Sequence, residues 1–140
     1  MDTPLMIGGH RVWREGDLVG MHFHGPLTRA DFTAMRTLFA AVMAEHGYCY
    51  MISDMTHCTA FEPEARKFLG EWSREGRDKV AGTAVYGVNF AMRALVTLVL
   101  NATKLISKGR PDDLAFVKDE AEARRWIARR RVEVAAGAML

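Results

Sequence analysis

The chain has 140 residues, enough for one domain with a buried core and too few for two ordinary domains. Hydrophobic residues make up 49% of the sequence and charged residues 26%, which is typical of a globular protein and excludes a disordered chain. The formal net charge is only +2, with basic and acidic residues interleaved, so the sequence lacks the charge pattern of a nucleic-acid-binding protein. We expect a single domain over residues 1–140, with its core in about residues 10–131.

Two features of the sequence favour a cytoplasmic protein. The N-terminus lacks the basic flank and apolar stretch of a signal peptide, and the most apolar predicted helix is interrupted by Arg93, Asn101 and Lys104. Cys49 lies inside a predicted strand and Cys58 lies beyond its end. Because a strand rises about 3.3 Å per residue, the two Cα atoms are expected to be farther apart than the ~7 Å that a disulfide allows. We therefore expect two free thiols, as in a reducing compartment.

The first predicted elements are a hairpin and a helix. In residues 10–25, apolar and polar residues alternate on both sides of Gly16-Asp17, which is typical of two antiparallel strands joined by a short turn. Thr28, with Asp31 three residues later, predicts the start of a helix, and Gly47 predicts its end. The apolar residues of this helix recur at helical spacing: Phe32, Met35, Phe39, Val42 and Met43.

Three strand-helix pairs follow. The short apolar runs 48–55 (YCYMISDM), 80–88 (VAGTAVYGV) and 114–117 (LAFV) are typical of strands buried on both faces. The predicted helices are an amphipathic one through Trp72 with Pro63 in its first turn, an apolar one from Phe90 to about Ser107 that Gly109 and Pro111 end, and a last one over 119–131. Acids in the first turn of this last helix and the basic cluster 129–131 in its last turn complement the helix dipole.

The element order predicts an α/β protein. Strands separated by single helices imply parallel neighbours joined by right-handed crossovers, while the hairpin at the start adds an antiparallel pair. We expect a mixed, largely parallel sheet with an N-terminal hairpin and about four helices. Ligands and partners usually bind such sheets at the carboxyl ends of the strands, and residues 51–59 (MISDMTHCT) lie at such an end.

Residues 51–59, together with two histidines of the hairpin, give only weak indications of metal binding or catalysis. His22 and His24 point to one side of their strand, about 6.5 Å apart, so they could share an ion if His57 or Cys58 supplied a third ligand. No HxxxH, CxxC or HExxH motif supports a metal, and we expect no cofactor. An enzyme using His57, Cys58 or Asp54 is the weakest hypothesis, because neighbouring residues in a loop rarely form a catalytic pair and no nucleophile or phosphate-binding motif is present. We expect a protein that is not an enzyme.

The same stretch is well suited to a capped turn. Thr59 and Glu62 have capping-box spacing for the helix through Trp72, and Asp54 could accept backbone N–H bonds in the loop after its strand. A helix N-terminus also favours phosphate or an acidic partner group, so a hydroxyl here is well placed for modification. Structural capping and a modifiable binding loop both remain open.

Several segments together resemble the STAS superfamily over roughly residues 10–131. They are the βαβαβα order, the strand end YMISDM with its Asp, the passage VAGTAVYGVNFAMRAL and the closing FVKDEAEARRWIA. The sequence is most similar to bacterial anti-sigma-factor-antagonist-like proteins, often grouped with CRAL-TRIO-type lipid-binding domains. The resemblance implies a non-enzymatic binding module, whose partner would be an anti-sigma factor or a kinase-like protein.

In STAS antagonists a partner kinase phosphorylates a Ser in an Asp-Ser-Ser-Gly turn at the N-terminus of the helix that follows the central strand. Asp54 matches the Asp of that turn and Thr56 the modified Ser, whereas Met55 and His57 replace the first Ser and the Gly. The resemblance therefore implies a partner-binding or switch loop that contains Asp54, Thr56, His57 and Thr59.

The long helix over residues 90–106 has apolar residues on more than one face, which predicts burial on several sides. Neighbouring helices could cover all of them, or one face could bind a second subunit, giving a homodimer, or a small apolar ligand or lipid. We take Phe90, Arg93, Val96 and Leu100 as the residues of that ligand or interface face. The expected function is a STAS-type regulatory module, and the alternative is a carrier or sensor of an apolar ligand held against this helix.

Overall fold

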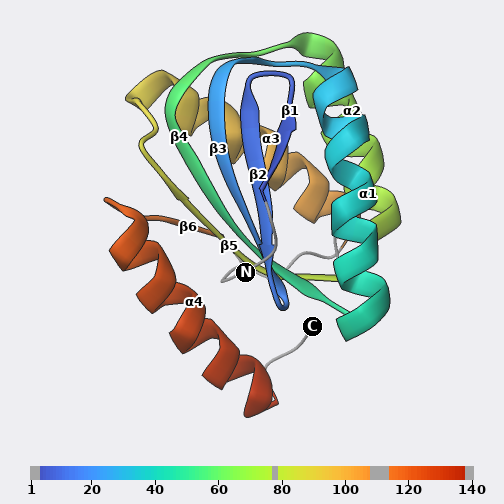
Figure 1. Ribbon diagram of the computed structural model, residues 1–140, viewed down its shortest axis with the longest axis vertical. Coiled ribbons are helices and arrows are strands. Elements are labelled where there is room, and N and C mark those ends of the chain that lie inside the picture. The colour runs from blue at the N-terminus through green and yellow to red at the C-terminus, as the bar shows by residue number, and fades with distance from the viewer. Residues whose placement is uncertain (1–3, 77–78, 108–113, 138–140) are drawn as a thin grey trace.

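The computed structural model describes residues 4–76, 79–107 and 114–137, and within them the side chains of all but residues 73–76 and 99–107. The described strands are β1 (Leu5–Ile7), β2 (His10–Glu15), β3 (Leu18–Leu27), β4 (Cys49–Phe61), β5 (Val80–Tyr86) and β6 (Leu114–Phe116). The described helices are α1 (Arg29–His46), α2 (Pro63–Gly76), α3 (Phe90–Ser107) and α4 (Glu120–Ala135). The strands form one sheet in the order β1-β2-β3-β4-β5-β6 (Figure 1). The predicted mixed α/β fold with an N-terminal hairpin is confirmed.

Local sequence signals explain where the first elements begin and end. Strands β2 and β3 pair antiparallel across the Gly16-Asp17 turn, as predicted. The Thr28 side chain accepts the Asp31 N–H while the Asp31 side chain accepts the Thr28 N–H, which is the predicted capping box of α1. Strand β1 was not predicted, because three residues are too few to give a periodic pattern.

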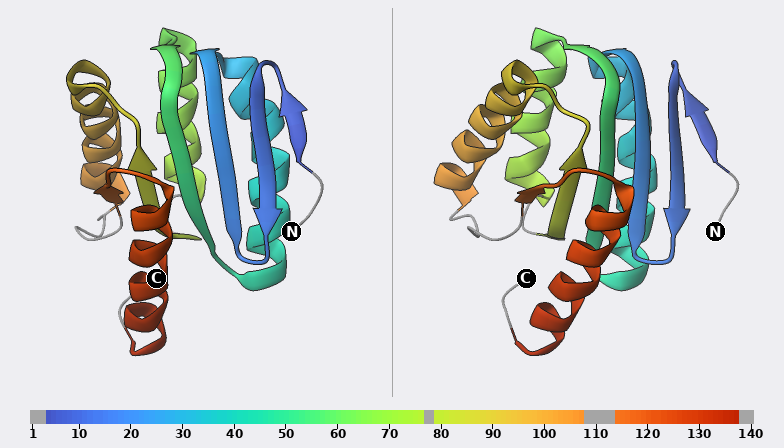
Figure 2. Two further views of the ribbon diagram at one scale, coloured as in Figure 1. Left: turned by 60° about the vertical axis from the view of Figure 1, so that its left-hand side comes forward. Right: turned by 90° about the vertical axis from the view of Figure 1, so that its left-hand side faces the viewer.

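The order of the strands in the sheet decides on which face the helices lie. The parallel strands β3, β4, β5 and β6 are neighbours in chain order, so the chain steps across the sheet in one direction. Right-handed crossovers then place all three connecting helices, α1, α2 and α3, on the same face. Helix α4 follows the last strand, is not a crossover, and lies on the opposite face (Figure 2).

We name the two sides of the sheet by what packs on them. The covered face carries Met21, Phe23 and Met51 and packs against α1, α2 and α3. The α4 face carries Leu18, Ile52 and Ala84 and packs against α4 through residues such as Ile127. The larger apolar cluster, and therefore most of the described core, lies on the covered face.

Helix α4 differs from the sequence prediction in a way that changes the role of its arginines. It runs to Ala135 instead of ending at the basic cluster. Arg130 is buried and its Nε donates to the Ala81 carbonyl at 2.8 Å, while Arg131 donates to Asp17 at 2.6 Å. These two arginines attach α4 to the sheet, and the last turn of α4 contains no basic residue, so the predicted role of the cluster at the end of the helix dipole was wrong. The predicted helix-ending signals Gly109 and Pro111 lie outside the described residues.

Candidate functional site

The stretch singled out in the sequence lies within a strand and not in a loop. Strand β4 runs from Cys49 to Phe61, so the predicted strand end near Met55 was wrong, and α2 begins only at Pro63. Strand β3 is also longer than its apolar run, and it pairs with β4 as far as Leu27 and Phe61. The longer partner strand explains the error, because pairing supplies backbone hydrogen bonds that local sequence does not reveal.

Asp54 and Thr56 form a β-bulge in β4. His22 pairs with Asp54 and His24 pairs with His57, so β4 has one residue more than β3 between these pairs. Asp54 Oδ1 accepts hydrogen bonds from the Thr56 N–H at 2.9 Å and from the Thr56 hydroxyl at 2.6 Å. The carboxylate thus binds a backbone N–H that the distorted ladder leaves free, and the predicted role of Asp54 as a backbone acceptor is confirmed.

The end of β5 packs directly against this bulge. Gly87 has a φ of +76°, and a Cβ on it would lie 2.2 Å from Thr56 Oγ1 and 2.7 Å from Thr56 N. Only glycine fits both the backbone conformation and the space. Thr56 is nevertheless exposed, as expected, so its hydroxyl is held in place on one side and open to solvent on the other.

The other two predicted switch residues also lie in β4. His57 is exposed, and its ring stacks on that of His24 with 5.0 Å between centroids. Thr59 lies at a second irregularity, where Gly25 pairs with Cys58 and Pro26 with Ala60. The predicted capping box of Thr59 and Glu62 is wrong, because Thr59 is in the strand and the helix starts four positions later, at Pro63.

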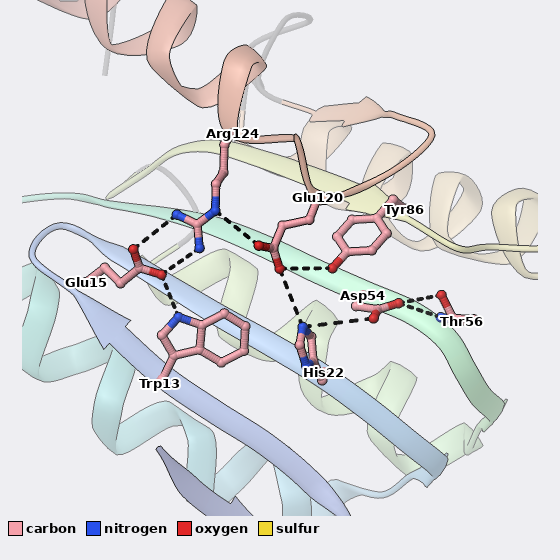
Figure 3. A network of polar contacts seen from close by, with 8 residues as sticks. All are labelled: Trp13, Glu15, His22, Asp54, Thr56, Tyr86, Glu120 and Arg124. Carbon is pink, nitrogen blue, oxygen red and sulfur yellow. Dashed lines mark hydrogen bonds and ion pairs between the residues drawn. The ribbon is translucent and has the colours of Figure 1, made fainter. Parts of the chain in front are cut away.

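A polar network that the sequence did not predict extends from Asp54 across the α4 face (Figure 3). His22 Nε2 lies 4.0 Å from Asp54 Oδ2 and 3.7 Å from Glu120 Oε1, so a protonated His22 would form ion pairs with both. The Tyr86 hydroxyl donates to Glu120 at 3.5 Å. The network joins β3, β4, β5 and the first turn of α4.

The second half of this network connects α4 to the hairpin of β2 and β3. Arg124 donates to both Glu15 oxygens, at 3.1 and 2.8 Å, and to Glu120 at 3.3 Å. Trp13 Nε1 also donates to Glu15, at 2.6 Å. The Glu120 and Arg124 pair has the i,i+4 spacing that sequence could have revealed. The contact between Glu15 and Arg124, by contrast, depends on tertiary structure alone.

The network shifts the pKa values of its members. Hydrogen bonds from Arg124, together with one from Trp13, lower the pKa of Glu15 from 4.5 to about 2, against an opposing effect of burial. Burial, and then the nearby carboxylates of Asp54 and Glu120, raise the pKa of Tyr86. Glu15 therefore stays ionised and Tyr86 stays a hydrogen-bond donor at neutral pH. The site offers fixed donors and acceptors around an exposed hydroxyl, an arrangement suited to recognition.

The predicted ligand or interface residues of α3 do not share one environment. Phe90 is 90% exposed, whereas Val96 is only 8% exposed. Arg93 is exposed, and its guanidinium carbon lies over the Phe116 ring, 4.7 Å from the ring centroid. Val96 therefore faces the core and cannot belong to an exposed interface with Phe90. Leu100 lies in α3 but outside the residues whose side chains are described. The exposed apolar residue two positions after Val96 is Leu98, which sequence analysis did not select.

Side chains of α3, α2 and α1 line a cavity of about 100 Å³ above the covered face, and this cavity is partly open to solvent. Its lining is almost entirely apolar and includes Val96 from α3 and Trp72 from α2. Sequence analysis located an apolar face on α3 but could not show that a cavity remained beneath it.

Neither a metal centre nor a disulfide is found in the described residues. Within residues 4–76, 79–107 and 114–137, no three His, Cys, Asp or Glu side chains converge as metal ligands. Cys49 is buried, Cys58 is half-buried, and both are free thiols, as predicted; burial raises the pKa of the Cys58 thiol. Among the helices of the described chain, none has the length and apolar character needed to cross a membrane.

The comparisons with known proteins identify the fold. No protein-family model and no curated protein matches the chain. An uncharacterised protein of the DUF3478 family from Shewanella loihica PV-4, with a SpoIIAA-like fold, is similar in structure with a TM-score of 0.60 at 20% identity, over 82% of this chain and 88% of that one. The anti-sigma factor antagonist SpoIIAA in its unphosphorylated form is similar with a TM-score of 0.57 at 13% identity, over 87% of this chain and 97% of that one. The chain therefore has a SpoIIAA-like fold, which agrees with the fold expected from the resemblance of its sequence to the STAS superfamily.

Proposed function

We propose that this protein is a cytoplasmic, non-enzymatic regulatory module that binds a partner protein through the surface around the bulge of Asp54 and Thr56. The observation that carries the proposal is the exposed Thr56 hydroxyl, which Asp54 and Gly87 hold in a fixed position. Fixed polar groups favour specific recognition because little conformational entropy is lost when a partner binds. Similarity in fold to the antagonist SpoIIAA supports a protein as the partner, of the anti-sigma-factor or kinase-like type.

Phosphorylation of Thr56 would act as a switch at this surface. SpoIIAA is described in an unphosphorylated form, which supports a phosphorylated one for that protein and, by analogy, for this chain. A phosphate on Thr56 would replace the hydroxyl that donates to Asp54 and would place negative charge beside that carboxylate. Repulsion between the two would open the bulge. The sequence-based idea that a helix N-terminus stabilises the charge does not apply, since α2 begins only at Pro63.

Thr56→Glu tests the proposal with a matched control. The tagged wild type, Thr56→Glu and Thr33→Glu are purified from the native cell, and bound proteins are quantified by mass spectrometry. Thr33 is an exposed threonine on α1, away from the bulge, so the same change there controls for added charge. We expect Thr56→Glu alone to change partner affinity by roughly 1–3 kcal/mol, the range for charge-assisted hydrogen bonds. Equal capture by all three proteins would refute the proposed surface.

A second candidate function is the binding of a small apolar ligand, which the cavity above the covered face favours. Its apolar lining resembles that of most small-molecule sites, although it is smaller than they are. Mass spectrometry of an organic extract of protein purified from the native cell tests this function. A small molecule present in equal amount with the protein would support it, and an extract with no enriched compound would count against it.

Self-association is a third question that α3 raises. Phe90 and Leu98 are 90% and 68% exposed, and exposed apolar residues on one helix favour an interface. We propose a homodimer through this side of α3. Sedimentation at micromolar concentration should then give a dimer mass for the wild type and a monomer mass for Leu98→Glu. A monomeric wild type would refute it.

A further inference from the structure

Among the described side chains that line the cavity, the polar ones lie at one place. It is bounded by strands β3, β4 and β5 and by helices α1, α2 and α3. Twelve of its lining residues are apolar, and the other two are Ser53 on β4 and Thr83 on β5. These two lie on adjacent strands, where Ser53 pairs with Val85 and Thr83 pairs with Met51. Both therefore face the cavity at diagonal positions on the floor formed by the sheet.

The Ser53 hydroxyl is accessible from the cavity. Ser53 is 7% exposed, but its hydroxyl oxygen is not among the fully buried side-chain atoms of the described residues that lack a hydrogen-bond partner. The hydroxyl can therefore donate to, or accept from, a molecule bound against this part of the lining.

We propose that the cavity binds a small apolar molecule with one hydroxyl or carbonyl group, and that Ser53 and Thr83 form hydrogen bonds to that group. The proposal rests on the apolar-ligand function above and specifies its ligand class and polar anchor. A hydroxyl side chain can donate or accept, so an alcohol, aldehyde or ketone fits equally well. None of the described side chains that line the cavity is charged, so a carboxylate is disfavoured.

The size of the cavity limits the ligand. A cavity of about 150 Å³ binds benzene in another protein, and the cavity here is about 100 Å³. The cavity is partly open to solvent, so this volume accommodates a ligand, or the inserted part of one, of about five non-hydrogen atoms. Met21, Met51 and Met55 line the cavity, and flexible thioether side chains allow modest adjustment to shape.

Two isosteric probes, 1-butanol and n-pentane, separate the polar anchor from the apolar cavity. Each is added to protein labelled at the methionine methyl groups, and binding is followed by NMR. The signals of Met51 and Met55 report on the cavity, and that of exposed Met6 on β1 serves as the internal control. We expect saturable shifts of the cavity methyl groups in the millimolar range of 1-butanol, with Met6 unchanged.

The variants Ser53→Ala and Thr83→Val remove the hydroxyls with little change in shape. We expect each to weaken 1-butanol binding about tenfold while n-pentane binding stays the same or improves. Equal binding of 1-butanol to wild type and variants would overturn the polar anchor but leave the apolar-ligand function standing. Failure of both probes to bind the wild type would overturn both. Neither result concerns partner binding at Thr56, which the capture experiment tests separately.

Discussion

The two faces of the sheet are built from different interactions. The covered face buries apolar side chains under three helices, and Phe32 and Phe39 stack there on Phe68 and Trp72 of α2. The α4 face is covered by one helix, which packs there through a smaller apolar cluster that includes Ile127. Polar contacts attach this helix as well, namely a buried hydrogen bond of Arg130 and exposed ion pairs such as that of Arg124 with Glu15. Apolar burial stabilises in proportion to area, whereas exposed ion pairs contribute little. The covered face should therefore supply most of the free energy of unfolding. Polar residues on the α4 face and at the bulge can then serve binding without a large cost in stability.

The same substitution at two positions of α3 tests the covered face most strongly. Val96→Glu places a carboxylate in the apolar cavity lining and should lower the free energy of unfolding by about 4 kcal/mol or more, because a buried charge loses its hydration. Leu98→Glu, at a 68% exposed position, should change it by less than about 0.5 kcal/mol. Urea unfolding followed by circular dichroism measures both. Similar values for the two would mean that α3 does not seal this face.

Two glycines with similar backbone conformations test the bulge. Gly87 and Gly25 have φ values of +76° and +79°, but a Cβ meets Thr56 only at Gly87 and finds nothing within 4 Å at Gly25. Gly25→Ala should cost about 1 kcal/mol for the left-handed conformation alone, and Gly87→Ala about 3 kcal/mol because the clash is added. Thermal unfolding of both gives the difference. A Gly87→Ala protein no less stable than Gly25→Ala would show that Thr56 is not held in place.

The arginines of α4 test how that helix is attached. Arg130→Leu leaves the Ala81 carbonyl without its side-chain donor and should cost about 2 kcal/mol, while Arg129→Leu at an exposed position should cost less than about 0.5 kcal/mol. Hydrogen exchange of the β5 amides, compared between the two variants, locates the effect. Equal protection in both would indicate that apolar contacts alone attach α4.

The pH dependence of stability should come partly from Glu15. Its pKa is lowered from 4.5 to about 2 in the folded protein, so the stabilisation is complete above 4.5 and is lost as the pH falls towards 2. We expect about 1 kcal/mol, because Arg124 is 41% exposed and solvent screens the pair. Glu15→Gln should be less stable than wild type at pH 7 and equal to it near pH 2, as measured by urea unfolding. Glu45→Gln, at an exposed position paired with Arg14, should show a smaller difference. A constant difference for Glu15→Gln at all pH values would exclude this origin.

Much of the fold could be predicted because its signals are local. The Gly16-Asp17 turn, the capping box of Thr28 and Asp31, and the helix over residues 90–107 depend on neighbouring residues and on helical periodicity. Strand β4 was predicted too short, because its second half lacks a long apolar run and is a strand only through pairing with β3. Thr56 was selected correctly as an exposed residue, but the reason given, a helix N-terminus, was not the one the structure provides.

The sequence by itself determined the α/β class and the order of the elements from β2 onward, because turns, caps and periodicity are local signals. The order of the strands within the sheet came from the tertiary structure, and with right-handed crossovers that order places α1, α2 and α3 on one face. Only the tertiary structure decided the two candidate sites. The bulge requires β3, β4 and Gly87 to meet, and the cavity requires three helices to leave space above Ser53 and Thr83. Contacts between distant residues and the volume left between side chains depend on packing in three dimensions, which no local pattern records.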